Sequence, residues 1–128
     1  MDLYLADTNI LIDCLRGRED RLTLMTKIVA SGGLVACSVI TVGELHAGMR
    51  PRERRQTEKL LSGLVQYEIT PEIARVAGDL KNSWAARGRT FSLLDMMIAA
   101  TAIVHDLILV TANVKDFPMP ELRLHPLV

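Results

Sequence analysis

The sequence predicts an α/β protein with three layers, α/β/α, in which helices cover both faces of a mostly parallel central sheet of about four to five strands. Three observations support this fold class. Short apolar runs typical of buried strands alternate with longer segments of helical periodicity. Turn and capping residues separate the two kinds of segment. Parallel strands need a long connection, usually a helix, so this alternation favours parallel pairing.

Length and composition are typical of one globular domain, expected over residues 1–128. Hydrophobic residues make up 49% of the chain and charged residues 23%, which argues against disorder. Lys and Arg number 15, as do Asp and Glu, so any binding of nucleic acid must depend on local patches. Cys14 and Cys37 lie in apolar segments and are expected to be buried free thiols. No leader or membrane-spanning run is evident, so a cytoplasmic protein is expected.

The N-terminal part of the chain contains two short apolar runs and three helical segments. The expected elements are a strand over 3–6, a helix over 9–15, a helix over about 19–30 and a strand over 34–37. Gly17 and Gly32 follow the first two helices, where glycine commonly ends a helix. Residues 38–45 then lead into a third helix, which carries Glu44.

The second half of the chain continues the alternation. The expected elements are a helix that opens at Pro51, an edge strand over 65–69, the longest helix from Pro71 with Gly88 past its end, an apolar helix over 92–104, a strand over 107–110 and a last edge strand over 122–124. Proline suits the first position of a helix because no hydrogen-bond donor is needed there. Residues 111–117 are expected to form a polar loop.

Four acidic residues, Asp7, Glu44, Asp95 and Asp116, each lie just after a predicted strand or near the start of a helix. One edge of a parallel sheet can therefore bring them together, and ligands bind at that edge in open α/β sheets. Carboxylates packed together repel unless a cation lies between them. Mg²⁺ or Mn²⁺ prefers oxygen ligands and keeps several waters, and such a site suits metal-assisted hydrolysis of a phosphodiester bond.

The same acids also allow a purely structural interpretation. Thr41 with Glu44, and Ser92 with Asp95, are spaced as capping boxes, in which a hydroxyl caps a helix and an acid follows three residues later. Asp7 or Asn9 could cap the first helix, and Asp116 could be a turn residue. Two facts favour a site: acids recur at the same edge of the sheet, and the carboxylate of Asp95 lies in an otherwise apolar helix.

Four segments, in this order, resemble the PIN-domain ribonucleases, especially the VapC-type toxins of toxin–antitoxin pairs. They are residues 6–12 (ADTNILI), 41–45 (TVGEL), 94–102 (LDMMIAATA) and 109–117 (LVTANVKDF). The resemblance implies that Asp7, Glu44 and Asp95 form a metal-binding acidic centre, and that either Asp116 or Asn113 completes it. It further implies an endoribonuclease that needs Mg²⁺ or Mn²⁺, a homodimer, and a VapB-like antitoxin that blocks the site.

Other residues are candidates for supporting roles. The resemblance places Thr8, Asn9, Thr111 and Asn113 beside the acids, where they would orient water, metal or carboxylates. Candidate contacts to RNA phosphates are Arg50, Arg87, Arg89 and Lys115. For the basic residues around Pro51, a solvated helix face is the leading interpretation and phosphate contact is the alternative. Leu11, Leu15 and Leu45 could contact an antitoxin or lie in the core. His46 is expected to face away from Glu44, two residues earlier on the same helix, and receives no catalytic role.

The alternative function is a PIN-like scaffold that binds RNA or protein without cutting it. Clustered carboxylates argue against that alternative, because pure binding of a polyanion gains nothing from them. Other doubly wound enzymes fit less well: Asp7-Thr8-Asn9 lacks the second acid of a haloacid dehalogenase phosphatase and the glycines of a dinucleotide-binding turn.

Overall fold

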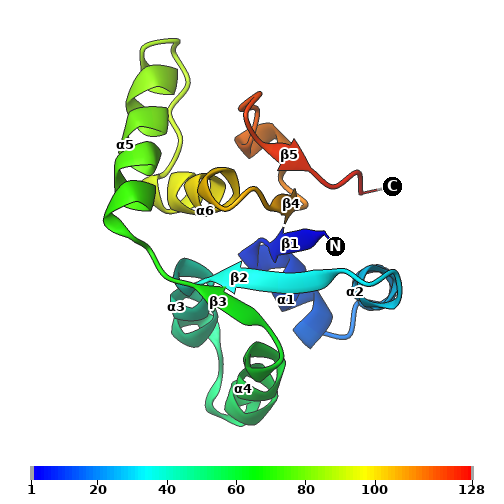
Figure 1. The fold of residues 1–128 in the computed structure, drawn as a ribbon. Coiled ribbons are helices and arrows are strands. Elements are labelled where there is room, and N and C mark those ends of the chain that lie inside the picture. Colours follow the sequence, from blue (N-terminus) through cyan, green and yellow to red (C-terminus); the bar gives the residue numbers. More distant parts are fainter. Residues whose placement is uncertain (1, 128) are drawn as a thin grey trace.

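The computed structural model describes residues 2–127. Its centre is a five-stranded sheet with the order β3-β2-β1-β4-β5, and every pair of neighbouring strands is parallel (Figure 1). The strands are β1 (Leu3–Ala6), β2 (Leu34–Ser38), β3 (Val65–Tyr67), β4 (Ile108–Val110) and β5 (Arg123–Leu124). The predicted fold class is confirmed, and the sheet is parallel throughout the described residues.

Helices occupy the connections between the strands. They are α1 (Thr8–Leu15), α2 (Glu19–Ala30), α3 (Val39–Gly48), α4 (Arg54–Ser62), α5 (Pro71–Ala85) and α6 (Leu93–Val104), with short 3₁₀ helices η1 (Pro51–Glu53) and η2 (Val114–Asp116). In Figure 1, α5 and α6 lie on one side of the sheet, and α1, α3 and α4 lie on the other. The arrangement is therefore three-layered, as predicted.

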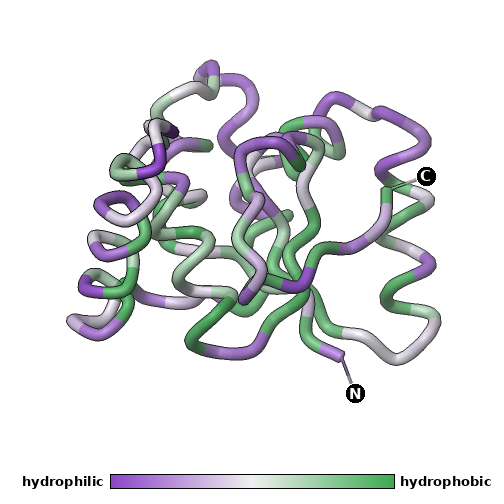
Figure 2. The backbone as a smooth tube through the Cα atoms, turned by 90° about the horizontal axis from the view of Figure 1, so that it is seen from above, coloured by the Kyte–Doolittle hydropathy of each residue, from purple (hydrophilic) through white to green (hydrophobic). Residues whose placement is uncertain are grey.

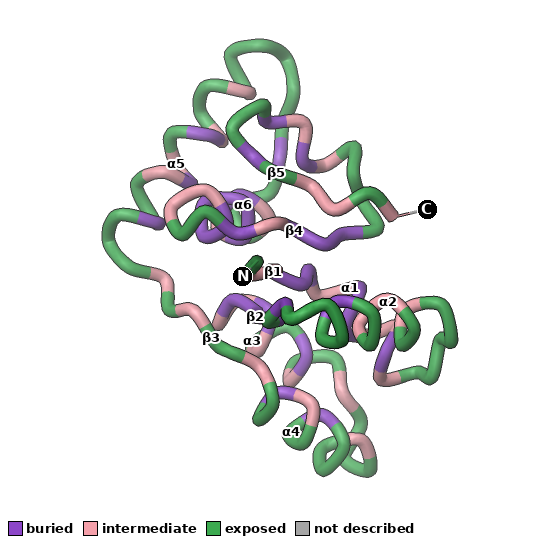
Figure 3. Tube along the Cα trace, turned by 45° about the vertical axis from the view of Figure 1, so that its right-hand side comes forward, coloured by how far each residue is buried: buried purple, intermediate pink, exposed green. Residues whose placement is uncertain are grey.

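Alternate residues of the central strands face the two helical layers. Leu5 of β1 and Leu109 of β4 pack with α5 and α6, whereas Ala6 and Val110, one residue later, pack with α1 and its neighbours. All four side chains are fully buried, and Figure 3 shows buried residues along β4 and α6, whereas α2 and α4 on the outside are largely exposed. A strand covered on both faces has to be apolar throughout, which explains the continuous apolar runs in the sequence.

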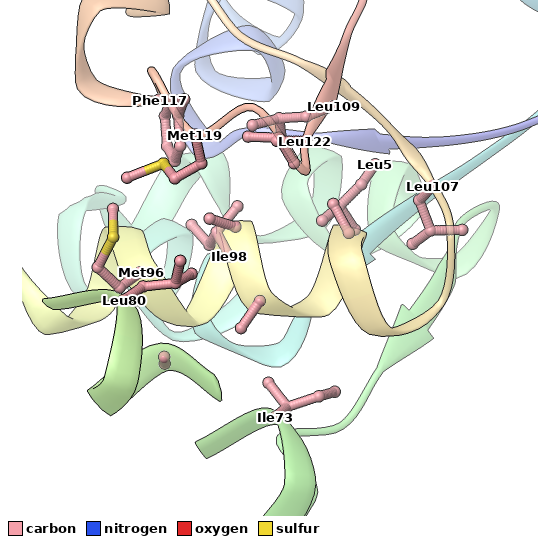
Figure 4. Packing of buried hydrophobic residues seen from close by; sticks show 14 of the residues in the cluster. Leu5, Ile73, Leu80, Met96, Ile98, Leu107, Leu109, Phe117, Met119 and Leu122 are labelled. Carbon is pink, nitrogen blue, oxygen red and sulfur yellow. The ribbon is translucent and has the colours of Figure 1, made fainter. Parts of the chain in front are cut away.

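The most apolar helix, α6, lies against the sheet. Met96 and Ile98 are buried between the sheet and α5, and Phe117 closes the same cluster from the C-terminal region (Figure 4). Hydrophobic stretches fill the middle of the molecule, while hydrophilic residues concentrate in the outer turns and loops (Figure 2). On the opposite face, Gly33 is needed where α2 returns to the sheet, because a Cβ there would lie 2.9 Å from the ring of Tyr4.

Most predicted elements begin and end within two residues of their expected bounds, and the differences at the two edge strands follow from how those strands pair. The edge strand β3 stops at Tyr67 instead of residue 69, because Tyr67 pairs with Ser38, the last residue of its only neighbour. The last strand is limited to Arg123–Leu124, which pair with Ile108 and Leu109. The predicted polar loop over 111–117 contains η2, and the helix after Pro51 begins with η1. Within residues 2–127, no helix is long and apolar enough to span a membrane.

Candidate metal centre

The candidate site begins where β1 and β4 end side by side. The chain adds β2 and β3 on one side of β1 and then returns to place β4 on the other side, so this is the point where the strand order reverses. Ligands of doubly wound folds bind at such a point. Asp7 follows β1 and Thr111 follows β4, and the Thr111 hydroxyl donates a hydrogen bond of 2.8 Å to Asp7 Oδ2. Asp7 is 5% exposed and Thr111 is 1% exposed.

Asp7 also caps the helix that follows it. Its Oδ1 accepts a hydrogen bond of 2.9 Å from the backbone N–H of Thr8, at the start of α1. The cap interpretation of Asp7 is therefore confirmed, and it does not compete with a role in a site. The two oxygens have different partners, so the carboxylate has a fixed orientation at the end of β1.

Glu44 reaches the site from the middle of α3. The Thr8 hydroxyl donates to Glu44 Oε1 at 2.6 Å and lies 2.9 Å from the Thr41 hydroxyl. A hydroxyl has one proton to donate, so Thr41 must donate to Thr8. Thr41 is fully buried. By donating to the Thr8 hydroxyl, it orients that hydroxyl toward Glu44.

The predicted capping box of Thr41 and Glu44 is wrong. Ser38 caps α3 instead, because its hydroxyl accepts from the N–H of Ile40 and the helix starts at Val39. Thr41 lies inside the helix. The buried strand β2 ends at Ser38, and this serine caps the helix three residues before Thr41, the cap that the spacing to Glu44 suggested.

Asp95 lies in the first turn of α6. The Ser92 hydroxyl accepts a hydrogen bond of 3.1 Å from the N–H of Asp95, so the predicted cap at Ser92 is confirmed. The carboxylate is half-buried at the end of the helix that otherwise contributes apolar side chains to the core. The cap fixes where α6 begins and thus where this carboxylate lies.

Asp116 ends the short helix η2, beyond the end of β4. The N–H of Asn113 donates to the Thr111 hydroxyl at 3.0 Å, and the N–H of Asp116 donates to the carbonyl of Asn113 at 2.9 Å. The Asp116 side chain is half-buried, whereas that of Asn113 is exposed. Thr111 therefore links the turn that carries both candidates for the fourth position directly to Asp7.

The four carboxylates share one electrostatic environment. Burial raises the pKa of Asp7, hydrogen bonds from Thr111 and Thr8 oppose the rise, and the charges of Asp95 and Glu44 add to it. Burial also raises the pKa of Asp95; the hydroxyl of Ser92 opposes this rise, and the charges of Asp116 and Glu44 reinforce it. Glu44, Asp95 and Asp116 thus each raise the pKa of another acid across the switch point. A cation between them would relieve both burial and repulsion.

The donor chemistry at this edge fits a hard divalent cation. The available groups are carboxylates, hydroxyls and the amide oxygen of Asn9, which is buried and has no hydrogen-bond partner among the described residues. Within residues 2–127, no three acidic, histidine or cysteine side chains are close enough to hold an ion together. Mg²⁺ keeps several waters and commonly uses only one or two carboxylates, so a tighter cluster is not required.

A family model for the PIN domain matches residues 4–118. The chain belongs to the PIN-domain family. This PIN domain is 38% identical to ribonuclease VapC19 of Mycobacterium tuberculosis over 94% of its own length and 98% of the relative. One chain in the structure of a toxin–antitoxin complex from Klebsiella pneumoniae is 31% identical to this chain and matches it with a TM-score of 0.78, with 96% of each chain covered. The structure of VapBC2 from Rickettsia felis matches with a TM-score of 0.86 at 24% identity, and the match covers 96% of this chain and 97% of the Rickettsia chain. This likeness supports the fold. The VapC-type resemblance is confirmed.

The four residues predicted to contact RNA phosphates lie in three different parts of the fold: before η1, in the loop after α5 and in η2. Arg50 is exposed before η1, and Lys115 is exposed within η2, next to Asp116. The guanidinium carbon of Arg87 lies 4.7 Å from the centre of the Trp84 ring. Arg89 donates to the carbonyl of Lys115 at 2.8 Å. Contact with phosphate stays a prediction for all four residues.

Several other expectations concern residues outside the acidic site. The Nε2 atom of His46 lies 2.6 Å from Glu58 Oε1, and His46 is not part of the acidic cluster, as expected. Cys14 and Cys37 are buried free thiols, as predicted. Leu11 and Leu45 are buried in the core, which removes them as surface contacts for an antitoxin.

Thr41 contributes to the site by a route that its predicted role as a cap did not define. A capping hydroxyl can also position an acid, and the buried hydroxyl of Thr41 belongs to the chain of hydrogen bonds that ends at Glu44. A threonine inside an apolar helix, three residues before an acid, was the available signal. The partner that gives it meaning, Thr8, is 33 residues away and becomes visible only in the folded protein.

Proposed function

We propose that this PIN domain is a divalent-metal-dependent endoribonuclease, the toxin of a toxin–antitoxin pair. The observation that carries the proposal is Asp7: a buried carboxylate, held through both oxygens, whose pKa is raised by burial and by two neighbouring acids. A structural cap needs neither burial nor acidic neighbours. The name of VapC19 and the similarity to a toxin–antitoxin complex support the same activity.

The residues of the chain have separable tasks in the proposed reaction. Asp7, Asp95, Glu44 and the fourth acid, Asp116, would hold Mg²⁺ or Mn²⁺, one or two of them directly and the others through the waters that the ion keeps. The bound cation would supply an activated water and neutralise charge on the phosphodiester. Thr111 orients Asp7, and Thr8, itself oriented by Thr41, orients Glu44. Groups that hold metal ligands in this way commonly contribute 10–100-fold to affinity or activity.

The proposed substrate is RNA, and the proposed inhibitor is a VapB-like antitoxin. The proposed oligomeric state is a homodimer. An RNA substrate places the activity in the cytoplasm. The supporting observations are the ribonuclease name of the relative and the partner present in the Klebsiella complex.

The test is cleavage of mixed RNA in the presence of Mg²⁺, with and without a chelator. Wild-type protein should cut RNA, and chelator should abolish the cutting. Asp7→Asn and Asp95→Asn should each reduce the rate at least about 100-fold, because each removes a charged metal ligand. Asp79→Asn is the matched control, since it removes the same charge from an exposed position on α5.

Two results would contradict the proposal. One is cleavage that survives chelator or both substitutions at the site. The other is retention of RNA without cutting under any divalent ion, which would identify the non-catalytic binding module instead. Circular dichroism of each variant shows whether a loss of activity comes from unfolding.

A further inference from the structure

The loop over residues 86–92 connects α5 to α6, and one of its side chains contacts the turn that carries Asp116. It leaves the end of α5, turns at Gly88 with φ +85°, and runs to the cap of α6, just before Asp95 (Figure 1). Lys81 of α5 anchors its far end by donating to the carbonyl of Phe91 at 2.6 Å. The loop is thus fixed to α5 and directly precedes a site carboxylate.

Arg89 lies in the middle of this loop, and its guanidinium has two kinds of contact. Its central carbon lies 4.9 Å from the centre of the Phe91 ring and 5.9 Å from that of Trp84. The two rings meet edge to face, with centres 6.0 Å apart. From this aromatic support, Nη2 donates a hydrogen bond of 2.8 Å to the backbone carbonyl of Lys115.

The accepting carbonyl belongs to η2, which is a single turn. Lys115 is its middle residue and Asp116 its last. The turn contains the backbone hydrogen bonds from Asp116 to Asn113 and from Phe117 to Val114. A turn of this length has little internal stability, so contacts from other segments, such as the one from Arg89, influence its conformation.

We propose that Arg89 is a positioning residue that fixes Asp116 relative to Asp95, rather than a contact to RNA phosphate. One side chain links the segment that precedes Asp95 to the turn that carries Asp116, 26 residues apart at the point of contact. The planar guanidinium can stack on aromatic rings and donate sideways at once, which a lysine ammonium cannot do. This inference rests on the proposed function for its effect on cleavage.

The activity test compares Arg89→Ala with Arg123→Ala. Arg123 is a matched control: it is exposed, and its Nη2 also donates to a backbone carbonyl, that of Asp106, at 2.9 Å. The contact of Arg123 lies at the other end of α6 from the site, because Asp106 follows the C-terminal end of this helix and Asp95 lies in its first turn. Arg89→Ala should lower kcat about tenfold at fixed Mg²⁺ without weakening RNA binding. Arg89→Lys should not restore the rate, and Arg123→Ala should leave it unchanged.

A double-mutant cycle decides between positioning and phosphate contact. If Arg89 acts through Asp116, removing Arg89 from an Asp116→Asn protein should cause no further loss. If Arg89 instead contacts phosphate, its loss should add fully to that of Asp116→Asn, raise KM for RNA and reduce the salt dependence of binding. The second result would overturn the proposal.

Amide hydrogen exchange provides a readout that does not depend on cleavage. In Arg89→Ala, the Asp116 and Phe117 amides should exchange several-fold faster, with no change in Arg123→Ala. Unchanged exchange in Arg89→Ala would overturn the positioning role even if cleavage falls. Faster exchange in a protein whose wild type cuts no RNA would support the positioning contact and refute the proposed function, so the two failures are distinguishable.

Discussion

At the scale of single residues, Asp7 shows that a cap and a site residue can be the same side chain. One carboxylate oxygen caps α1, and the other receives the Thr111 hydroxyl, 104 residues away. The cap alone would allow an exposed side chain. Here burial and two acidic neighbours disfavour the charged form, so the position opposes stability in the absence of a cation. This is the arrangement expected of a residue maintained for binding.

Substituting Asp7 by Asn should therefore alter how stability depends on pH. Because folding raises the pKa of Asp7, its contribution is most favourable below the unfolded pKa of about 3.9 and is lost as pH rises through the folded value. Asparagine does not titrate and still caps a helix well. In metal-free protein, the stability of Asp7→Asn relative to wild type should increase from pH 3 to pH 7, measured by urea unfolding. A constant difference, like that expected for Asp79→Asn, would show that Asp7 is not destabilised by its charge.

At the scale of elements, each site acid depends on how its helix begins or is held. The caps at Asp7, Ser38 and Ser92 determine the first residues of α1, α3 and α6. A further contact joins α3 to α4: His46 lies within hydrogen-bond distance of the Val42 carbonyl and of Glu58. With acceptors at both nitrogens, the protonated imidazolium is the form that satisfies both. The link holds the helix that carries Glu44.

The contact between His46 and Glu58 should make a pH-dependent contribution to stability. The Val42 carbonyl and then Glu58 raise the pKa of His46, while partial burial and Arg54 lower it. A raised folded pKa means that the stabilisation is complete below the unfolded value of about 6.5 and disappears as pH rises through the folded one. Glu58→Gln should therefore be more destabilising at pH 6 than at pH 9 in thermal unfolding. An equal effect at both pH values would contradict a charged pair.

The sequence predicted the elements that are dictated by local patterning, but not the strand bounds and side-chain contacts that are decided by distant partners. Continuous apolar runs identified β1, β2 and β4, because strands covered on both faces exclude polar residues. The end of β3 depends on where β2 ends, and the role of Thr41 depends on Thr8, so neither could be inferred locally. The position of Arg89 beside the Lys115 carbonyl likewise needs the packing of α5 and η2.

At the scale of the whole molecule, the strand order creates the candidate site. With β1 in the middle, the ends of β1, β2 and β4 lie at one edge, followed by Asp7, α3 with Glu44, and Thr111. The start of α6 adds Asp95 to the same charged group. The alternation of strands and helices predicted that the acids would lie at one edge of a parallel sheet. It could not predict the order of the strands in that sheet. The groove of about 1290 Å³ between α2 and the C-terminal segment meets this site only near Thr111.

Divalent ions should stabilise the whole fold through this site. A ligand that binds only the folded state at 100 times its Kd adds about 2.7 kcal/mol of stability. The Tm should therefore rise with Mg²⁺ concentration, and more steeply with Mn²⁺ if Mn²⁺ binds more tightly. Asp7→Asn and Asp95→Asn should abolish the rise in differential scanning fluorimetry, whereas Asp79→Asn should retain it. An equal rise in all variants would indicate unspecific ion effects.

The hydrogen bond between Asp7 and Thr111 also has a consequence during synthesis. Asp7 leaves the ribosome 104 residues before Thr111, and β4 must insert beside β1 before the two side chains meet. A nascent or truncated chain that ends before β4 therefore lacks the completed centre. For an enzyme that would attack cellular RNA, the order of translation itself withholds activity until β4 and Thr111 have been synthesised.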